Sequence, residues 1–267
     1  MALVKTLVIA DLHNKVHWVE ECIEAEKPDL VVFLGDYFDS FDETLESTIQ
    51  TAEWLKQSLD KPKRVHLMGN HDMPYRYPSN SHLYCPGFTH EKSHLINDLL
   101  DHQSSWEKLK SFHFIDGWLL SHAGIHQKLL HPILGFDLEQ LRRDEEEAFL
   151  RCASGIGTPM FGCGRSRGGS YLCGGITWQD FDIDFVPMQE VNQIVGHTPH
   201  PQVCVKLLID EEFVKCTWDE FLSLDQYRGA KSVNFGLDTH RKYYAVIEDG
   251  VVRAIKNQFV NKLDLSQ

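Results

Sequence analysis

The sequence predicts an α/β fold in which two stacked β-sheets are flanked by helices. Two observations support this fold class. At the start of the chain, the apolar segments 6–10 and 30–34 have the length and composition of buried strands, and apolar residues at helical spacing lie between them. Such a β-α-β unit implies parallel strands. The C-terminal half is instead rich in strand-like segments that we expect to form a meander, and the combination fits two sheets covered by helices.

The other elements of the first half follow from apolar spacing and from the residues that interrupt it. An apolar face predicts a helix from about 43 to 59, and Lys61-Pro62 ends it. A third strand is expected at 64–68. The dipeptide Asp116-Gly117 is typical of a hairpin turn. The remaining elements expected here are helices at 93–102, 104–110 and 138–152 and hairpin strands at 112–115 and 118–120.

The second half contains five strand-like segments and no sign of a domain boundary. No linker, internal repeat or change in composition divides the chain, so we expect residues 1–267 to form a single domain. Two irregular segments are expected near a functional site: 73–87, with its prolines and tyrosines, and 155–175, with its glycines. The charged run 142–147 is interpreted as a solvated helix face. The expected strands are 191–195, 203–209, 232–237, 243–248 and 251–256.

The composition is that of a soluble globular protein. Hydrophobic residues make up 42% and charged residues 24% of the 267 residues. The formal net charge of −13 argues against sequence-independent binding to nucleic acid or acidic membranes. No apolar run approaches the roughly twenty residues of a membrane span. Seven scattered cysteines without a Cys-x-x-Cys pair, and a beginning without a signal peptide, predict a cytoplasmic protein with reduced thiols.

Metal-type ligands follow apolar strands at five places in the chain. Asp36 comes after the strand 30–34 and a glycine turn, so its carboxylate lies at the strand tip, where α/β folds place their ligands. Its two oxygens can bridge two cations. Turn chemistry alone does not explain the repetition of the same arrangement. The residues at the strand ends are Asp11 and His13, Asp36, Asn70 and His71, His122, and His197.

These residue types suit a transition-metal site with a proton-transfer residue beside it. Asp11 and His13 lie two residues apart and can both turn towards one cation. They combine a hard oxygen with a borderline nitrogen, which suits Mn, Fe or Zn. Asn70 offers a neutral amide oxygen, while the imidazole of His71 can carry a proton near neutral pH.

Five blocks of the chain resemble the signature of calcineurin-like metallophosphoesterases in residue identity, order and spacing. Two looser blocks, 174–180 and 234–238, resemble the phosphoprotein phosphatase branch of that superfamily, which includes Ser/Thr protein phosphatases and symmetrical dinucleoside tetraphosphatases. The five blocks are Asp11-x-His13, Gly35-Asp36-x-x-Asp39, Gly69-Asn70-His71-Asp72, Ser121-His122-Ala123-Gly124 and Gly196-His197-Thr198.

The resemblance implies a four-layer α/β/β/α sandwich with two mixed sheets and a centre of two metal ions. Asp36 would bridge the metals. By motif position, Asp11 and His13 would complete the first metal site, and Asn70, His122 and His197 the second. We expect manganese, with iron or zinc as alternatives.

The resemblance also implies a reaction. Two cations would acidify a bridging water to hydroxide, which attacks phosphorus in line, so that no phosphoenzyme is required. His71 would protonate the leaving alkoxide, and Asp39 would orient the imidazole and stabilise its cationic form. The expected substrate is a phosphomonoester, either a Ser/Thr phosphoprotein or a small molecule. The alternatives are a dinucleoside polyphosphate or a phosphodiester substrate, and a non-enzymatic scaffold, although the full set of ligands is present.

His200 occupies a position that leaves its role open. Many diesterase branches of the superfamily carry Gly-His-x-His, with the second histidine on the first metal. Here Pro199 displaces His200 by one place. The sequence Gly-His-Thr-Pro fits the phosphoprotein phosphatase branch better, with three protein ligands at the first metal.

One substrate-binding residue of that branch is missing from this chain. The branch usually follows Gly-Asp-x-x-Asp with Arg-Gly, and the arginine grips the substrate phosphate, but here Ser40-Phe41 follows. Another arginine is expected to take this role, because a planar bidentate donor matches a phosphate dianion. The candidates are Arg76, Arg165 and Arg167. We favour Arg165 or Arg167, because glycine lets the segment 155–175 close over a substrate.

Overall fold

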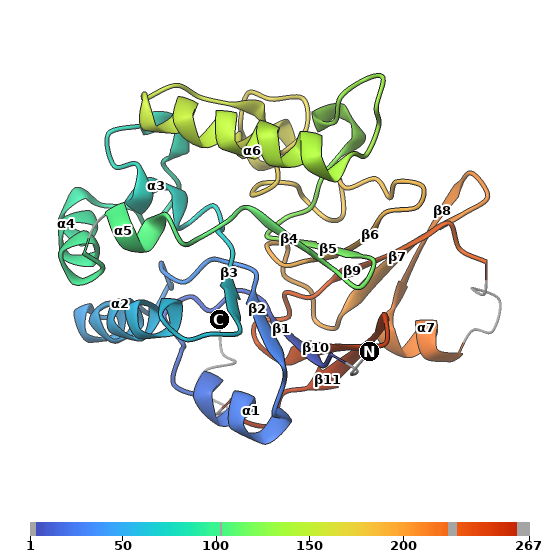
Figure 1. Cartoon of the computed structure of the whole chain (residues 1–267), viewed down its shortest axis with the longest axis horizontal. Coiled ribbons are helices and arrows are strands. Elements are labelled where there is room, and N and C mark those ends of the chain that lie inside the picture. Colours follow the sequence, from blue (N-terminus) through green and yellow to red (C-terminus); the bar gives the residue numbers. More distant parts are fainter. Residues whose placement is uncertain (1–3, 102, 224–228, 261–267) are drawn as a thin grey trace.

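The computed structural model describes residues 4–101, 103–223 and 229–260 of the chain. Its described strands form a five-stranded and a six-stranded sheet (Figure 1). In spatial order, the first sheet consists of β11 (Val251–Lys256), β10 (Tyr243–Glu248), β1 (Thr6–Ile9), β2 (Leu30–Phe33) and β3 (Arg64–His66). The second consists of β4 (Phe112–Ile115), β5 (Trp118–Ser121), β6 (Asn192–Val195), β9 (Ser232–Gly236), β7 (Cys204–Ile209) and β8 (Glu212–Thr217).

Helices surround the two sheets, as the predicted fold class requires (Figure 1). Within the described ranges, none of them is both long enough and apolar enough to cross a membrane. The α-helices are α1 (Val19–Glu26), α2 (Leu45–Leu59), α3 (Met73–Arg76), α4 (His90–Leu99), α5 (Gln103–Trp106), α6 (Leu138–Ala153) and α7 (Trp218–Ser223). Residue 102, the last of the expected helix 93–102, lies outside the described residues.

The strand pairing confirms the parallel start of the chain. β1 pairs in parallel with β2, and β2 with β3. β5, β6 and β9 also run parallel, whereas β10 pairs antiparallel with β1 and β4 with β5. Both sheets are therefore mixed. Because parallel strands end at the same edge, the residues that follow β1, β2 and β3 meet there.

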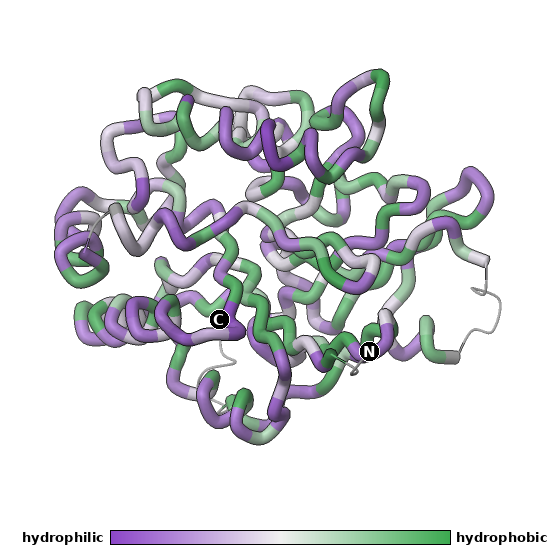
Figure 2. Tube along the Cα trace, in the orientation of Figure 1, coloured by the Kyte–Doolittle hydropathy of each residue, from purple (hydrophilic) through white to green (hydrophobic). Residues whose placement is uncertain are grey.

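Alternating side chains bury both faces of the first sheet. Val8 belongs to a hydrophobic cluster with Ile194 and Phe235 of the second sheet, while its neighbour Leu7 belongs to a different cluster with Leu55 of α2. This alternation is the period of a strand. The central strands appear as a hydrophobic interior in Figure 2, and the helices around them alternate hydrophilic and hydrophobic residues. The fold thus has a core between the sheets and another beneath the helices.

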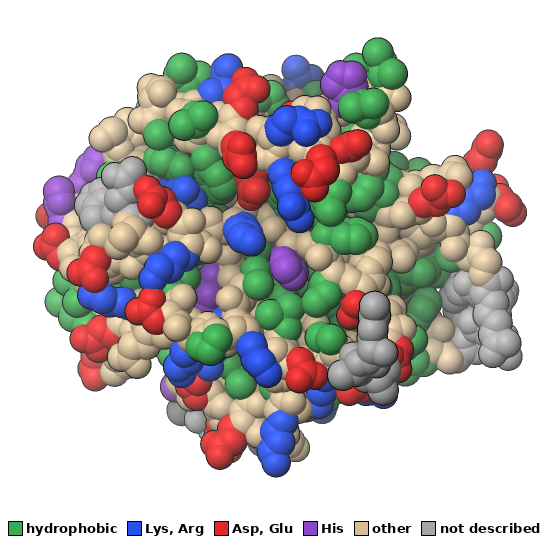
Figure 3. Space-filling view, viewed as in Figure 1, with side chains coloured by type: hydrophobic (Ala, Val, Ile, Leu, Met, Phe, Trp, Pro, Cys, Tyr) green, Lys and Arg blue, Asp and Glu red, His purple; other side chains and the backbone are tan. Residues whose placement is uncertain are grey.

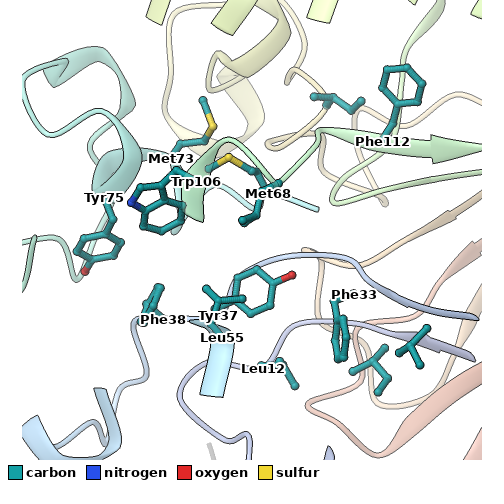
Figure 4. Close-up of a cluster of buried hydrophobic side chains, with 14 of the residues drawn as sticks. Leu12, Phe33, Tyr37, Phe38, Leu55, Met68, Met73, Tyr75, Trp106 and Phe112 are labelled. Carbon is teal, nitrogen blue, oxygen red and sulfur yellow. The ribbon is translucent and has the colours of Figure 1, made fainter. Parts of the chain in front are cut away.

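A cluster of buried aromatic side chains lies directly behind the loops after β2 and β3. Figure 4 shows Tyr37 and Phe38, which follow Asp36, facing Tyr75 and Trp106 across this cluster. Phe38 contacts both rings edge-on, at centroid distances of 5.4 and 6.5 Å. The loops that carry the strand-end residues are therefore fixed by packing.

The segment 73–87 differs from the expected loop, because it contains α3 and a 3₁₀-helix, Ser81–Leu83. Pro74 lies in the first turn of α3, where its missing N–H costs no helical hydrogen bond. The prolines of this segment therefore do not exclude a helix, because a proline is compatible with the first turn of one. The charged run on α6 is mostly exposed, but Glu145 is partly buried and accepts hydrogen bonds from the backbone N and Oγ of Ser111, at 2.5 and 2.6 Å.

The C-terminal strands do not form one continuous meander. β9 belongs to the second sheet, and β10 and β11 return to the first. Strand composition cannot reveal this division, because both sheets offer the same apolar surroundings. The sequence reading also missed β8 and α7. β8 is an edge strand in which no side chain is fully buried, so its apolar periodicity is weak.

Candidate active site

The strand ends bring the expected metal ligands together. Asp11 follows β1, Asp36 follows β2 and Asn70 follows β3, while His122 follows β5 and His197 follows β6. Among the described residues, two of the groups whose ligand atoms lie within 4.8 Å of one another consist of these strand-end residues. The groups are Asp11, His13 and Asp36, and Asp36, His122 and His197. Asp36 is common to both, which is the arrangement that a bridging carboxylate requires.

Two glycines allow the loops that carry Asp36 and Asn70 to touch. Gly35 has φ of +104°, and a Cβ there would lie 2.3 Å from the backbone N of Gly69. A Cβ on Gly69 would lie 2.0 Å from Oδ1 of Asp36. Real side chains do not tolerate such distances, so both positions need glycine. The close approach places the Asp36 carboxylate against the backbone of the next strand-end loop.

Asp72 ties these two loops together from the inside. Its carboxylate is fully buried and accepts hydrogen bonds from the backbone N–H groups of Asp36 at 2.8 Å, Tyr37 at 3.0 Å and Gly69 at 2.8 Å. Burial, followed by the charge of Asp36, raises the pKa of Asp72 to about 7. The sequence motif contains Asp72 but gave it no role. Its role here is to hold the Asp36 loop in position.

The first ligand group has a histidine with a fixed tautomer. Nδ1 of His13 lies 3.0 Å from the carbonyl oxygen of Phe38 and 2.9 Å from that of Asp39. Carbonyls only accept, so Nδ1 carries the proton and Nε2 presents its lone pair. That Nε2 lies 3.8 Å from Oδ2 of Asp36. Asp11 is buried beside them and accepts the backbone N–H of His197 at 3.1 Å.

The second ligand group gathers nitrogen and oxygen ligand atoms in one place. Nδ1 of His122 donates to the carbonyl oxygen of Leu34 at 3.0 Å, which directs Nε2 at the other ligand atoms. That Nε2 lies 3.0 Å from Oδ1 of Asn70, 3.2 Å from Nδ1 of His197 and 3.3 Å from Oδ2 of Asp36. Imidazole nitrogens, an amide oxygen and a carboxylate oxygen that converge in this way are ligands for a divalent cation. This donor set therefore fits a metal ion.

The electrostatics of the cluster also favour positive charge. Burial raises the pKa of Asp11 to about 6, with Asp36 contributing in the same direction. Burial would raise the pKa of Asp36 too, but the imidazoles around it, His122 first, lower it below the usual value. For His122, burial lowers the pKa, yet Asp36 and Asp11 outweigh it and raise the pKa to about 9. The carboxylates thus stabilise cationic neighbours.

His71 and Asp39 form a hydrogen-bonded pair at the edge of the cluster. Nδ1 of His71 lies 3.0 Å from Oδ2 of Asp39, and the His71 backbone N–H donates to Oδ1 of Asp36 at 2.9 Å. Burial lowers the pKa of His71, but Asp36 and Asp39 raise it well above its usual value. The imidazole therefore holds a proton next to the metal ligands, as a general acid must.

Two residues that the sequence did not indicate hold Asp39 in place. The hydroxyl of Tyr75 donates to Oδ1 of Asp39 at 2.5 Å, and Nζ of Lys92 donates to the same oxygen at 2.6 Å. Oδ2 is left to face His71. Burial raises the pKa of Asp39, but the hydrogen bonds from His71, Lys92 and Tyr75 lower it overall. Tyr75 and Lys92 come from α3 and α4, and no motif spacing links them to Asp39.

The three candidate arginines lie in different surroundings. Arg167 is next to the ligand cluster: its Nη2 donates to Oγ1 of Thr198, the residue after His197, at 3.0 Å. Its Nε is 2.8 Å from Oδ2 of Asp180, although this N–H is not directed at an acceptor. Arg165 is exposed.

Arg76 points into another part of the molecule. Its guanidinium stacks on Phe149 at 4.2 Å and Tyr77 at 5.2 Å. Its hydrogen bonds go to Sδ of Met68 and the carbonyl oxygen of Leu109. Arg76, Tyr77 and Phe149 line a cavity of about 710 Å³ that contains none of the expected metal ligands.

Two further residues near the ligand groups are His200 and Asp238. His200 is absent from both groups around Asp36; it forms a separate group of metal-type side chains with Asp182 and Cys204, and its Nε2 pairs with Oδ1 of Asp182 at 3.1 Å. Asp238 is buried, and burial together with the charge of Asp11 raises its pKa to about 6. In the sequence, the block 234–238 indicates only a resemblance to the phosphoprotein phosphatase branch. The structure adds a third carboxylate close to Asp11 and His13.

The fold and the site define a metal-dependent phosphoric ester hydrolase. A family model described as calcineurin-like phosphoesterase matches residues 4–201. The match extends over most of the chain, and the chain belongs to this family. No protein among those with curated functions matches the sequence.

Several solved structures are similar to the chain at low sequence identity. A metallophosphoesterase from Sphaerobacter thermophilus is 16% identical over 95% of this chain and 87% of that chain, with a TM-score of 0.46. A protein serine/threonine phosphatase from Saccharomyces cerevisiae is 13% identical over 95% of this chain and 80% of that chain, with a TM-score of 0.47. The phosphoesterase Yfce from E. coli is 11% identical over 94% of this chain and 92% of that chain, with a TM-score of 0.39.

Proposed function

We propose that the protein is a phosphatase that hydrolyses phosphomonoesters with a centre of two metal ions. The observation that carries this proposal is the sharing of Asp36 by two adjacent ligand groups, with the His71–Asp39 pair beside them. A bridging carboxylate between two sets of ligands suits two cations better than one. Manganese is the ion that we propose, because the ligands mix hard oxygens with imidazole nitrogens.

The ligands divide into two sets around Asp36. Asp11 and His13 would hold the first ion, and Asn70, His122 and His197 the second. When bound, the two ions would polarise the phosphoryl group and generate the nucleophile from water near neutral pH. The geometry leaves Nε2 of His71 free for the substrate, because Nδ1 faces Asp39 at 3.0 Å.

His71 then supplies the proton that the leaving group needs. Asp39 holds the imidazole in the tautomer and orientation for that transfer, and stabilises its cationic form. Tyr75 and Lys92 keep Asp39 ionised and aimed at His71. An alkoxide is a poor leaving group without a proton, so this pair matters most for alkyl phosphates such as phosphoserine or a sugar phosphate.

The test of the proposed function is metal-dependent turnover. Purified protein should hydrolyse a small alkyl phosphate, lose this activity when a chelator removes the metals, and regain it with manganese. Metal analysis should find two ions per chain in the active form. Activity that is unchanged in excess chelator, with no metal bound, would refute the proposal. A preference for a bis-aryl diester or a dinucleoside tetraphosphate over every monoester would instead move the assignment to that substrate class.

We further propose that Arg167 grips the substrate phosphate. Its Nε pairs with Oδ2 of Asp180 at 2.8 Å and its Nη2 donates to Thr198, and these two contacts hold the guanidinium beside His197. Arg167→Ala should lower kcat/KM by roughly a hundredfold with the metal content unchanged, as expected for a charge-assisted contact of about 1.5–3 kcal/mol. The exposed neighbour Arg165→Ala is the matched control. An equal loss in both variants, or a loss below threefold in Arg167→Ala, would place the phosphate-binding residue elsewhere.

A further inference from the structure

A cysteine that belongs to none of the sequence motifs lies against the general-acid pair. The thiol of Cys85 is 3.5 Å from Nδ1 of His71 and 3.6 Å from the carbonyl oxygen of Asn70. Asp39, His71 and Cys85 each present a ligand atom, and these atoms lie within 4.8 Å of one another. A carboxylate, an imidazole and a thiol in this arrangement are ligands that zinc prefers.

The backbone fixes Cys85 in this position. Residues Cys85 to Phe88 form a turn closed by a hydrogen bond from the N–H of Phe88 to the carbonyl oxygen of Cys85, at 3.3 Å. Pro86 and Gly87 are its central residues, and Gly87 has φ of +95°, as in a type II turn. A Cβ on Gly87 would lie 2.8 Å from Cβ of Asp39. The turn therefore packs directly on Asp39, and the approach requires glycine.

The spacing of the three side chains matches zinc coordination. With Zn–N near 2.0 Å and Zn–S near 2.3 Å, tetrahedral geometry puts the nitrogen and sulfur about 3.5 Å apart. The separation of Nδ1 of His71 and Sγ of Cys85 is 3.5 Å. Oδ1 of Asp39 is engaged by Tyr75 and Lys92, but Oδ2 faces the other two ligands. The His71 side chain is 19% exposed, so an ion can reach the group from solvent.

We propose that Asp39, His71 and Cys85 form an inhibitory zinc site, separate from the two ligand groups around Asp36. The inhibitory role rests on the proposed phosphatase function. Zinc would displace the proton from Nδ1 of His71 and from the thiol of Cys85, and both protons leave to solvent. The hydrogen bond between His71 and Asp39 is then lost. His71 no longer forms the oriented cation that protonates the leaving group, so turnover falls while the metals around Asp36 remain.

The test compares zinc inhibition in two cysteine variants of the manganese-loaded enzyme. With manganese in excess, zinc should inhibit the wild type and Cys163→Ala equally, and the inhibitory concentration should rise at least about tenfold in Cys85→Ala. Cys163 is another partly buried thiol outside the metal-type groups, which makes it the matched control. Inhibition in the wild type should be stronger with an alkyl phosphate than with an aryl phosphate, because only the former depends strongly on His71. Equal zinc sensitivity in all three proteins would overturn the proposal and assign inhibition to the ligands around Asp36.

A second measurement tests the site without enzyme activity. Cobalt added to the manganese-loaded protein should produce a thiolate-to-cobalt absorption band that is present in Cys163→Ala and absent in Cys85→Ala and Cys85→Ser. The absence of this band in the wild type would refute metal binding at Cys85 even if zinc inhibits. If the band appears but the manganese form has no phosphatase activity, the metal site stands and the proposed function fails.

Discussion

Replacing Asp36 by asparagine should lower phosphatase turnover by at least about a thousandfold, or roughly 4 kcal/mol in the activation barrier. Among the described residues, Asp36 belongs both to the group with Asp11 and His13 and to the group with His122 and His197, and no other residue belongs to both. An amide of the same shape keeps the packing but loses the negative charge that two cations need. We expect metal analysis of Asp36→Asn to find less than one ion per chain, against two in the wild type.

The comparison variants separate a bridging role from a general loss of charge. Asp60→Asn removes an exposed carboxylate that pairs with Lys108, and should leave both metal content and turnover unchanged. Asp11→Asn affects one ligand group only, and should lose one ion. If Asp36→Asn retains two ions per chain, or loses no more metal than Asp11→Asn, Asp36 does not bridge two metals.

The sequence was sufficient for the elements whose pattern is local. Lys27-Pro28 and Lys61-Pro62 mark the returns to strand, and the parallel start follows from them. The hairpin at Asp116-Gly117 is also confirmed, with φ of +50° and +82° at its two residues. The sheet to which a strand belongs is not a local property. The connection at 237–242 carries the chain from β9 back to the first sheet, and nothing in its composition distinguishes it from a meander turn.

In the site, likewise, some residues could be predicted from local motifs, whereas others depend on packing. Strand-end motifs indicated the members of both ligand groups around Asp36, because each motif is a short segment with fixed geometry. The residues that contact Asp39 and His71 from other segments of the chain could not be predicted from motifs. Tyr75 and Lys92 reach Asp39 from two helices, and Cys85 reaches His71 through a turn that depends on Gly87. Such contacts depend on how helices pack, which no single segment encodes.

Replacing His71 by glutamine should slow the hydrolysis of alkyl phosphates by roughly 10²–10⁴-fold, the usual range for general acid catalysis. The same variant should lose less than about tenfold on an aryl phosphate, whose leaving group needs little protonation. The physical basis is the position of the imidazole: its Nδ1 faces Asp39 and its backbone N–H is bound to Asp36. Steady-state rates on paired alkyl and aryl substrates measure the difference, with metal content as a check on the neighbouring Asn70. His113→Gln, in β4, is the control and should leave both rates unchanged.

Asp39 gives the decisive comparison, because we expect it to act through His71. Asp39→Asn should reproduce most of the loss on alkyl phosphates, since an amide can hydrogen-bond to the imidazole but does not stabilise its cation. The double variant should be little worse than His71→Gln alone, because residues that act as a unit are strongly non-additive. Losses that multiply in the double variant would show that Asp39 contributes independently of His71. Equal losses on aryl and alkyl substrates would show that His71 acts on phosphate binding or on the metal ligands rather than on the leaving group.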